Sequence, residues 1–542
     1  MADNMAIDTE LSVEDEPTLQ SQSSGVDTGP NHEHDRTEET NSAQITRSHA
    51  SSTVDEDVSL SPWFPRWRGN RIYHGNPEAF GWCLDSIGRA VAFAAAGAFL
   101  FPALLRLAKE DAGCETDPPP GSNKVPDCDE RVYGIKPSSL LTTLIIVVGI
   151  ISAVLLPFLG AVVDYTDKRL KVGKITSAIL CILLLPSLAL GPSTWFPITL
   201  LQLVVAFVGW AQTTVTYAYL PELTRSQERL NQYTQSFTIT SFLSMLLCLG
   251  FVVGVASLVG FDDDEVVVAQ LGIFVSFVST TPLLYFAWFK LLKPRPASRQ
   301  LNESTPLWKA GFVQVYQSAI FIHKNLPALR WFYISVCFID AGTGSLATIL
   351  ITYLTDTLAF TTSENATAIL AILIGSIPGA FASGYANRWW YPVWSAIAAT
   401  TIMVANTVAA AITLKEPGQQ TETYILGLVW GFGAGWKWTS DRLLASTLIP
   451  DGQDTELMGV YLFSGQVLVW LPPLVFTAMN EAGVSQRAGI GFSSIWFIFG
   501  IIALYLIGDY RKAVAKAGRE EMLLKDHDRS SLHEMNTAGQ AL

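Results

Sequence analysis

Charged residues are scarce in this chain. Asp, Glu, Lys and Arg make up 15% of its 542 residues, whereas an ordinary soluble domain carries about 25%. Hydrophobic residues make up 49%, and the mean hydropathy is +0.31. Most of the charges lie near the two ends, so the net charge of −13 reflects acidic tails. This composition argues against a soluble globular protein and gives no reason to expect nucleic-acid binding.

Several catalytic signatures are also missing. The chain has no Gly-x-x-x-x-Gly-Lys-Ser/Thr phosphate loop, since Gly173-Lys174-Ile175 lacks both the hydroxyl and the upstream glycine. It has no His/Cys metal cluster and no nucleophile elbow. We therefore predict a protein that is not an enzyme, that needs no metal or cofactor, and that does not use ATP to drive transport.

Cysteine is sparse as well, with six in the chain. Four of them, Cys83, Cys181, Cys248 and Cys337, lie in apolar segments and are expected to be small buried hydrophobic residues. Cys114 and Cys128 share a polar, Pro-rich loop that we place on the non-cytosolic side of a membrane, where disulfides persist. The sequence therefore leaves two alternatives for this pair, a Cys114–Cys128 disulfide or two free thiols.

The chain is instead rich in long apolar segments. About 20 mainly apolar residues are enough to cross a bilayer as a helix. By that rule we predict twelve spanning helices, at roughly 81–107, 138–163, 174–191, 197–220, 236–258, 267–291, 331–354, 366–386, 391–414, 422–446, 458–480 and 487–509. No apolar segment with a cleavage site precedes them, so the first helix should itself direct membrane insertion.

Lys and Arg predict the orientation of these helices. The loops after the second, fourth and sixth segments carry Lys168, Arg169, Lys171, Lys174, Arg225, Arg229, Lys293, Arg295, Arg299, Lys309 and Lys324. The loops after the third, fifth and seventh carry none. We therefore expect both termini in the cytosol. Asn365, in Asn365-Ala366-Thr367, then falls on the opposite face and is a candidate for N-glycosylation.

The segments fall into two groups of six. The predicted domains are a disordered acidic cytosolic tail at 1–77, a six-helix bundle at 78–291, a cytosolic linker at 292–330, a second six-helix bundle at 331–510 and a cytosolic tail at 511–542. The fold class is thus an all-α polytopic membrane protein built from two six-helix pseudo-repeats. A solute site is expected at the interface of the halves.

Short internal matches support a duplication. Pro157-Phe-Leu-Gly160-Ala161 follows the second segment, and Pro378-Gly379-Ala380 follows the eighth; Arg169 and Arg388 stand equally far beyond the two glycines. Tyr219-Leu-Pro-Glu222 ends the fourth segment, and Leu448-Ile-Pro-Asp451 ends the tenth. The matches occupy equivalent positions in the two halves, as a duplicated chain requires.

The turn that begins at Gly160 is a candidate gate. Gly160 would allow close helix approach, Asp164 could pair with a base or cap a helix, and Lys168 and Arg169 hold the loop in the cytosol. A purely topogenic basic loop is the alternative. In the second half Ser383 stands opposite Asp164, so any charge latch should be asymmetric, and Asp164→Asn should impair cycling more than Ser383→Ala.

Ionisable residues inside a span are costly and mark functional candidates. Asp85 and Arg89 lie one helical turn apart, and Asp340 lies midway along the seventh segment beside Gly342 and Gly344, which could loosen the helix. For Asp85, Arg89 and Asp340, substrate or ion binding and structural pairing remain alternatives.

Further polar residues lie nearer the helix ends. Lys437, Asp441 and Arg442 are near the cytosolic end of the tenth segment, which favours gating or snorkelling. Tyr217 and Tyr219 either donate hydroxyls into a cavity or anchor the helix at the interface. Gln202, Gln212 and Asn406 are ambiguous in the same way.

Five motifs carry a family resemblance: Gly81-Trp82-Cys-Leu-Asp85, Ala218-Tyr219-Leu-Pro-Glu222, Asp340-Ala-Gly342, Asp441-Arg442 followed by Ile449-Pro450, and Met458-Gly459-Val-Tyr461. Over about residues 78–510 the chain resembles the autophagy-related vacuole effluxer family, a branch of the major facilitator superfamily. The resemblance implies a vacuolar or lysosomal permease that returns neutral amino acids such as leucine to the cytosol after autophagic breakdown, with proton coupling as a candidate driving force.

Two other functions stay open from the residues alone. One is a permease of the same fold for another small solute, such as a sugar, an organic acid or a drug. The other is a non-transporting receptor or scaffold that uses the acidic tail. Paired charges inside the membrane favour a transporter, because they would be costly in a scaffold.

Overall fold

The computed structural model describes residues 75–114, 128, 130–224, 227–261, 264–297, 306–450 and 454–518. The expectations for most of the two tails fall outside these ranges. Within them the regular elements are helices, apart from one isolated bridge between Val132 and Ile135. The prediction of an all-helical chain is confirmed.

Six helical segments build the first half. The first segment is α2 (Pro77–Ala95), which continues through the π-helical turn η2 (Ala96–Leu100) into α3 (Phe101–Asp111). The second is the short η3 (Pro137–Ser139) followed by α4 (Leu140–Tyr165). The other four are α5 (Arg169–Ser187), α6 (Trp195–Leu223), α7 (Gln227–Val259), and α8 (Glu265–Tyr285) with the π-helical η4 (Phe286–Leu291). The Asn76 side chain caps α2 by accepting hydrogen bonds from two backbone amides of its first turn, with Pro77 at the first helical position.

The second half follows a helix within the predicted linker. This linker helix is α9 (Leu307–Asn325), and the half itself comprises α10 (Pro327–Asp356), α11 (Thr362–Thr413), α12 (Gln420–Leu448), α13 (Asp454–Val467), α14 (Leu471–Glu481) and α15 (Gln486–Tyr505), with the short α16 (Tyr510–Lys516) after it. α11 contains both the eighth and the ninth predicted segments. They meet at Tyr391, whose φ of 61° before Pro392 interrupts the helix.

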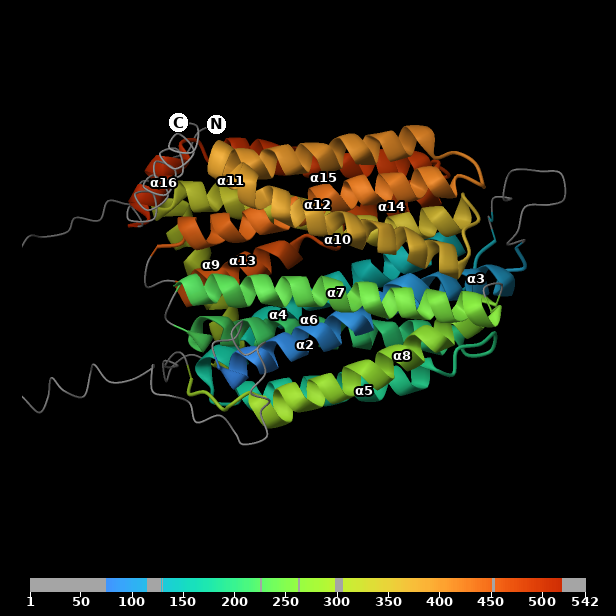
Figure 1. Cartoon of the computed structure of the whole chain (residues 1–542), viewed down its shortest axis with the longest axis horizontal. Helices are drawn as coiled ribbons and strands as arrows, with labels where there is room; N and C mark the ends of the chain where they lie inside the picture. The colour runs from blue at the N-terminus through green and yellow to red at the C-terminus, as the bar shows by residue number, and fades with distance from the viewer. Residues whose placement is uncertain are drawn as a thin grey trace, which may run out of the picture. The chain divides into compact units, whose positions relative to one another are not determined.

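The helices run between two ends of the bundle (Figure 1). The termini end is the one at which α2 begins and α15 ends, and α16 lies there. The loop end is the opposite one, at which α3 ends and α4 begins.

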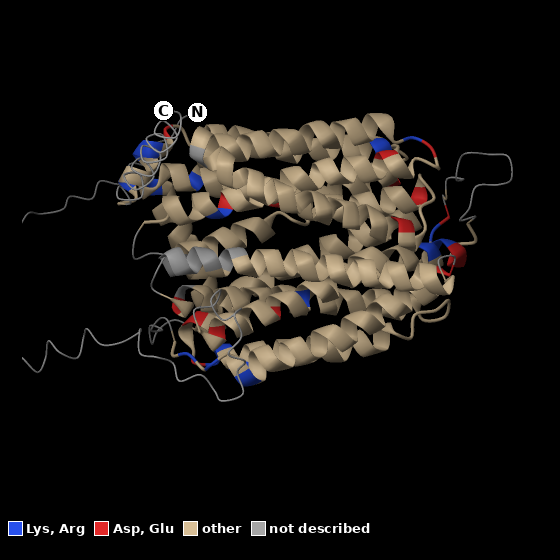
Figure 2. Ribbon diagram, viewed as in Figure 1, with Lys and Arg blue, Asp and Glu red and all other residues tan. Residues whose placement is uncertain are grey.

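The outer surface of the bundle suits a bilayer. Eleven helices of the described residues are long and apolar enough to cross a membrane. Large apolar side chains face outward along them, including Ile182, Leu247 and Phe274, which are more than half exposed. Charged residues gather toward the two ends of the helices, with few between (Figure 2). The chain is a multi-pass integral membrane protein.

α12 corresponds to the tenth predicted segment and is not among these eleven helices. Its 29 residues are long enough to span a bilayer, and they include the charged Glu422, Lys437, Asp441 and Arg442. α12 packs against α11 through glycines, and a Cβ added at Gly379 or Gly431 would lie 2.0 Å from a carbonyl oxygen of the other helix. Small residues allow such backbone contact between membrane helices, so α12 is fixed within the bundle.

The expectation for Gly160 is wrong. A Cβ added there meets nothing within 4 Å, so no neighbouring helix requires a glycine at this position. The close approach on α4 occurs nearby, where Gly311 of α9 lies against the Pro157 carbonyl.

Candidate functional site

Asp85 is the centre of a polar network buried in the first half. Its Oδ2 accepts hydrogen bonds from Arg89 Nε and Thr216 Oγ1, both at 2.8 Å. Its Oδ1 accepts from Gln212 Nε2 at 2.6 Å and Trp288 Nε1 at 2.7 Å. A carboxylate has about four acceptor positions, so these four donors saturate it. Of the two alternatives for Asp85, the structure favours structural pairing.

Arg89 connects this network to α6. Besides its bond to Asp85, its Nη1 donates to Thr213 Oγ1 at 2.6 Å. The guanidinium side chain is 8% exposed. The predicted pairing of Asp85 with Arg89 on one face of α2 is therefore present, and it extends to two further helices through Thr213 and Trp288.

A second buried network lies in the other half. Lys437 Nζ, on α12, is 2.5 Å from Asp340 Oδ1 on α10 and 2.6 Å from Asp441 Oδ2 one turn along its own helix. Lys437 and Asp441 are 1% and 2% exposed, whereas the Asp340 side chain is 25% exposed. One cation thus serves two carboxylates, and Asp340 is the accessible one.

This second network lies next to the first half. Arg442 follows Asp441 directly and donates from Nη1 to Thr238 Oγ1 on α7. Four residues earlier on α12, Trp438 stacks on Phe242 of α7 with ring centroids 5.7 Å apart. The charged network is therefore at the interface of the two halves, where the duplication predicts a solute site.

The halves are also joined at the loop end. Lys109 Nζ of α3 lies 2.7 Å from Asp356 Oδ1 of α10, and both side chains are less than a tenth exposed. Asp356 Oδ2 accepts a further hydrogen bond from Gln486 Nε2 at 2.9 Å. Asn480 Nδ2 of α14 donates to Ser138 Oγ at 2.7 Å. These contacts close the bundle at that end.

The family profile described as Major Facilitator Superfamily matches residues 87–473. The chain belongs to the Major Facilitator Superfamily. Its predicted fold of two six-helix halves is confirmed by this match and by solved transporters of the same fold.

Three of these solved structures are similar over most of their length. A mutant of the nucleoside transporter NupG is 13% identical with a TM-score of 0.54, covering 79% of this chain and 100% of that one. The human organic anion transporter MFSD10 (TETRAN) is 13% identical with a TM-score of 0.55, covering 79% and 99%. FucP, in the outward conformation, is 11% identical with a TM-score of 0.50, covering 80% and 98%. At these identities the likeness concerns the fold. No curated protein sequence matches the chain significantly.

Arg169 of the predicted gate belongs to a charge cluster at the termini end of this major facilitator protein. Arg169 is 1% exposed and donates from Nη1 to Glu222 Oε1 at 2.7 Å and to the Ala218 carbonyl at 3.1 Å. Glu222 also lies 3.6 Å from Arg295, which in turn pairs with Glu78. The charge cluster at the termini end therefore joins the starts or ends of α2, α5, α6 and η4.

Sequence reasoning missed three members of that cluster: Glu78, Glu222 and Arg295. Two of them lie in stretches that the sequence singles out, since Glu222 belongs to the Tyr-Leu-Pro-Glu motif and Arg295 to the basic loop. Nothing in the sequence indicates that these two residues pair. Asp164 is half-buried at the end of α4, and Lys168 is exposed before α5.

The second half has a neutral network in the corresponding place. Ser383 Oγ and Ser440 Oγ are 3.0 Å apart, and Asn387 contacts both at 3.0 Å. Trp436 Nε1 donates to Ser395 Oγ at 2.8 Å, and Ser395 contacts Ser440 at 3.2 Å. The side chain of Arg388 lies outside the described part of the structure. Ser383 thus belongs to a network of neutral side chains, and the asymmetry of a charge latch at Asp164 stays a prediction.

Several of the alternative roles that the sequence left open find no support in the structure. Tyr219 does not donate into a cavity, because its buried hydroxyl donates to the Lys293 carbonyl at 3.1 Å. Lys437 does not snorkel toward water, because it is held between two carboxylates. α10 runs unbroken through Gly342 and Gly344, so these glycines free no backbone groups. Tyr217 instead packs against Trp82 and Phe237, with ring centroids 6.4 and 5.6 Å apart.

The structure contains the disulfide that was one alternative for the loop end, but it leaves no room for the predicted glycan. Cys114 and Cys128 are joined by a disulfide, with their Cα atoms 5.8 Å apart. Asn365 is fully buried in the first turn of α11, where its Nδ2 donates to Thr355 Oγ1 at 3.1 Å and to the Thr361 carbonyl at 3.1 Å. A glycan on that nitrogen would have no room, so the glycosylation expectation is not retained.

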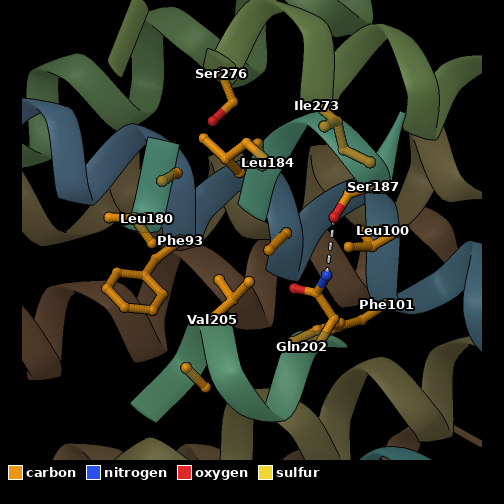
Figure 3. A pocket seen from close by; sticks show the side chains of 14 residues that line it. Phe93, Leu100, Phe101, Leu180, Leu184, Ser187, Gln202, Val205, Ile273 and Ser276 are labelled. Atoms are coloured by element: carbon orange, nitrogen blue, oxygen red, sulfur yellow. Dashed lines mark hydrogen bonds between the residues drawn. The ribbon is translucent and has the colours of Figure 1, made fainter. Parts of the chain in front are cut away.

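The remaining intramembrane amides are bonded within the protein. Asn406 Nδ2 donates to the Leu426 carbonyl at 3.0 Å. Gln202 Nε2 donates to Ser187 Oγ at 3.2 Å, at the wall of a mainly apolar cavity in the first half (Figure 3). This cavity of about 40 Å³ has room for a few water molecules at most, so it is too small for a solute.

Proposed function

We propose that this major facilitator protein is a secondary active transporter that exports neutral amino acids, such as leucine, from a vacuolar or lysosomal lumen to the cytosol. The proposal rests on the partly exposed Asp340 carboxylate within an otherwise buried charge network at the interface of the halves. Alternating access around such a site is how two six-helix repeats move a solute.

The chemistry of the interface suits a zwitterion. Asp340 can accept hydrogen bonds from an α-ammonium group, and Arg442, which is partly exposed beside Asp441, can donate to an α-carboxylate. Lys437 offsets one of the two negative charges of Asp340 and Asp441 when no solute is bound. Two carboxylates that share one buried cation make this network the candidate site of proton coupling.

The direction of transport, from lumen to cytosol, rests on the family resemblance. With the termini end in the cytosol, the loop end that Lys109 and Asp356 join would face the lumen. The vacuolar location rests on the family resemblance of Tyr219 to Glu222 and of Asp441 to Pro450.

Counterflow of radiolabelled leucine in proteoliposomes tests the proposal. We expect Asp340→Asn to lower leucine counterflow by at least about tenfold, the effect of losing about 1.4 kcal/mol of binding free energy. Arg442→Gln should lower leucine counterflow to a similar extent, since each of the two substitutions removes one charged group that would bind the zwitterion. Glu416→Gln is the matched control, because Glu416 is exposed in the loop before α12.

Three outcomes decide between the functions. Leucine counterflow that depends on Asp340 supports the proposal. Counterflow of a sugar, nucleoside or organic anion without leucine transport would replace the substrate and keep the transporter. If deletion of residues 1–60 abolishes a cellular phenotype and leaves any transport intact, the receptor or scaffold function is the better explanation.

A further inference from the structure

The linker helix α9 exposes a row of large apolar side chains. Trp308, Phe312, Tyr316 and Ile320 follow one another at every fourth residue and are 61%, 43%, 67% and 36% exposed. Residues four apart lie on one face of a helix, so these side chains form one stripe, which we call the α9 stripe. A linker in water would not expose such a stripe.

The opposite face of α9 is fixed to the bundle. Ala310, Ser318 and Ile322 are buried, and a Cβ added at Gly311 would lie 2.0 Å from the Pro157 carbonyl oxygen of α4. Pro157 belongs to the apolar spanning segment Pro137–Tyr165. α9 therefore packs against α4 within the part that crosses the membrane.

The α9 stripe lies beside the outward-facing surface of α4. One residue from the contact with Gly311, Phe158 is 39% exposed, and Val154 one turn earlier is 54% exposed. Both side chains belong to the apolar outer surface that suits lipid. A lipid chain that covers Phe158 can continue onto the neighbouring helix.

The basic charge of this segment suits an anionic membrane surface. Between Glu303 and Asp340 the sequence has no acidic residue, while it has Lys309, Lys324 and Arg330. Lys309 and Lys324 are exposed on α9, and their long side chains can reach lipid headgroups while the helix body contacts acyl chains. Basic residues near a bilayer surface favour anionic lipids.

We propose that α9 is a membrane-embedded interface helix whose stripe of Trp308, Phe312, Tyr316 and Ile320 binds bilayer lipid, with anionic headgroups at Lys309 and Lys324. The connection between the halves is then held at the bilayer surface and is not a free cytosolic linker. This assignment goes beyond the proposed transport and does not depend on the solute.

A fluorescent label at a single position tests it in the full chain. Tyr316→Cys is labelled with NBD and reconstituted in vesicles of equal phosphatidylcholine and phosphatidylserine, with doxyl-labelled lipid as the membrane quencher and iodide as the aqueous quencher. Ile150→Cys, on the outward face of α4, is the lipid control, and Asp167→Cys, in the exposed turn after α4, is the aqueous control. Labelling of the unsubstituted chain measures how much of the NBD fluorescence comes from the native Cys181 and Cys337.

We expect the doxyl lipid to quench the label at position 316 about as strongly as the label at position 150, and iodide to quench only the label at position 167. Phe312→Cys is the second variant and should behave like Tyr316→Cys. Quenching of both stripe labels by iodide would overturn the proposal. Protection from both quenchers would overturn it too, because a protein partner would then cover the stripe. No solute is needed, so the result is separate from the transport test.

Discussion

Asp85 shows what a membrane protein needs in order to bury a charge. The carboxylate is fully buried, yet Arg89 balances its charge and three neutral donors fill its remaining acceptor positions. Removing one partner of such a buried pair costs far more than the pair itself contributes, because the other charge is left alone.

We therefore predict that Asp85→Asn destabilises the protein by about 3–5 kcal/mol. Thermal unfolding in detergent measures this, and the Asp85→Asn/Arg89→Gln double variant should recover part of the loss because it removes the orphaned guanidinium. An Asp85→Asn protein of unchanged melting temperature that no longer transports would show that Asp85 binds solute after all.

At the residue scale the sequence revealed only local pairs. The spacing of four residues predicts Asp85 with Arg89, because the helix brings them together. The contact between Lys437 and Asp340 joins two helices that are far apart in sequence, and a single sequence holds no information about which helices meet. The same limit explains why Glu222 and Arg295 were missed.

At the scale of elements, the pair α11 and α12 depends on glycine. A Cβ on Gly431 would lie 2.0 Å from the Ile372 carbonyl oxygen, and one on Gly435 would lie 2.0 Å from the Ser376 carbonyl oxygen. Backbone atoms cannot move away as a flexible side chain would, so the two helices must separate to admit even a methyl group. Gly384, also on α11, has nothing within 4 Å.

Gly431→Ala is accordingly expected to cost about 1–3 kcal/mol through overpacking. Gly384→Ala should be neutral or slightly stabilising, since alanine has the better helix propensity by about 1 kcal/mol. Melting temperatures of the two variants in the same detergent provide the comparison. Equal losses would mean that the close contact of α11 with α12 does not hold this part of the bundle together.

The boundaries of a helix were predictable where a continuous apolar run covers its whole length. The segment predicted at 138–163 is an example, because it lies within η3 and α4. α9 was not predicted as a membrane element, because its 19 residues include polar and basic ones and its apolar side chains form a stripe instead of a continuous run. The join between the eighth and ninth segments was predicted as a gap. The structure instead shows a kink at Tyr391.

At the scale of the whole molecule, alternating access requires two halves that open at one end while they close at the other. The duplicated motifs predict the halves, and the fold confirms them. The contacts that close the loop end were not predictable, because Lys109 and Asp356 sit at the edges of predicted segments, where charges are ordinary. A buried ion pair between the halves must separate each time that end opens.

Reversible cross-linking between positions 109 and 356 tests whether transport requires the loop end to open. In the Lys109→Cys/Asp356→Cys protein, a reducible bis-methanethiosulfonate linker should abolish leucine counterflow in proteoliposomes, and dithiothreitol should restore it, because transport requires the loop end to open. The two single variants and the unsubstituted chain, treated alike, control for the lost ion pair and for reduction of the Cys114–Cys128 disulfide. Counterflow at the unlinked rate in fully cross-linked protein would contradict alternating access between these halves.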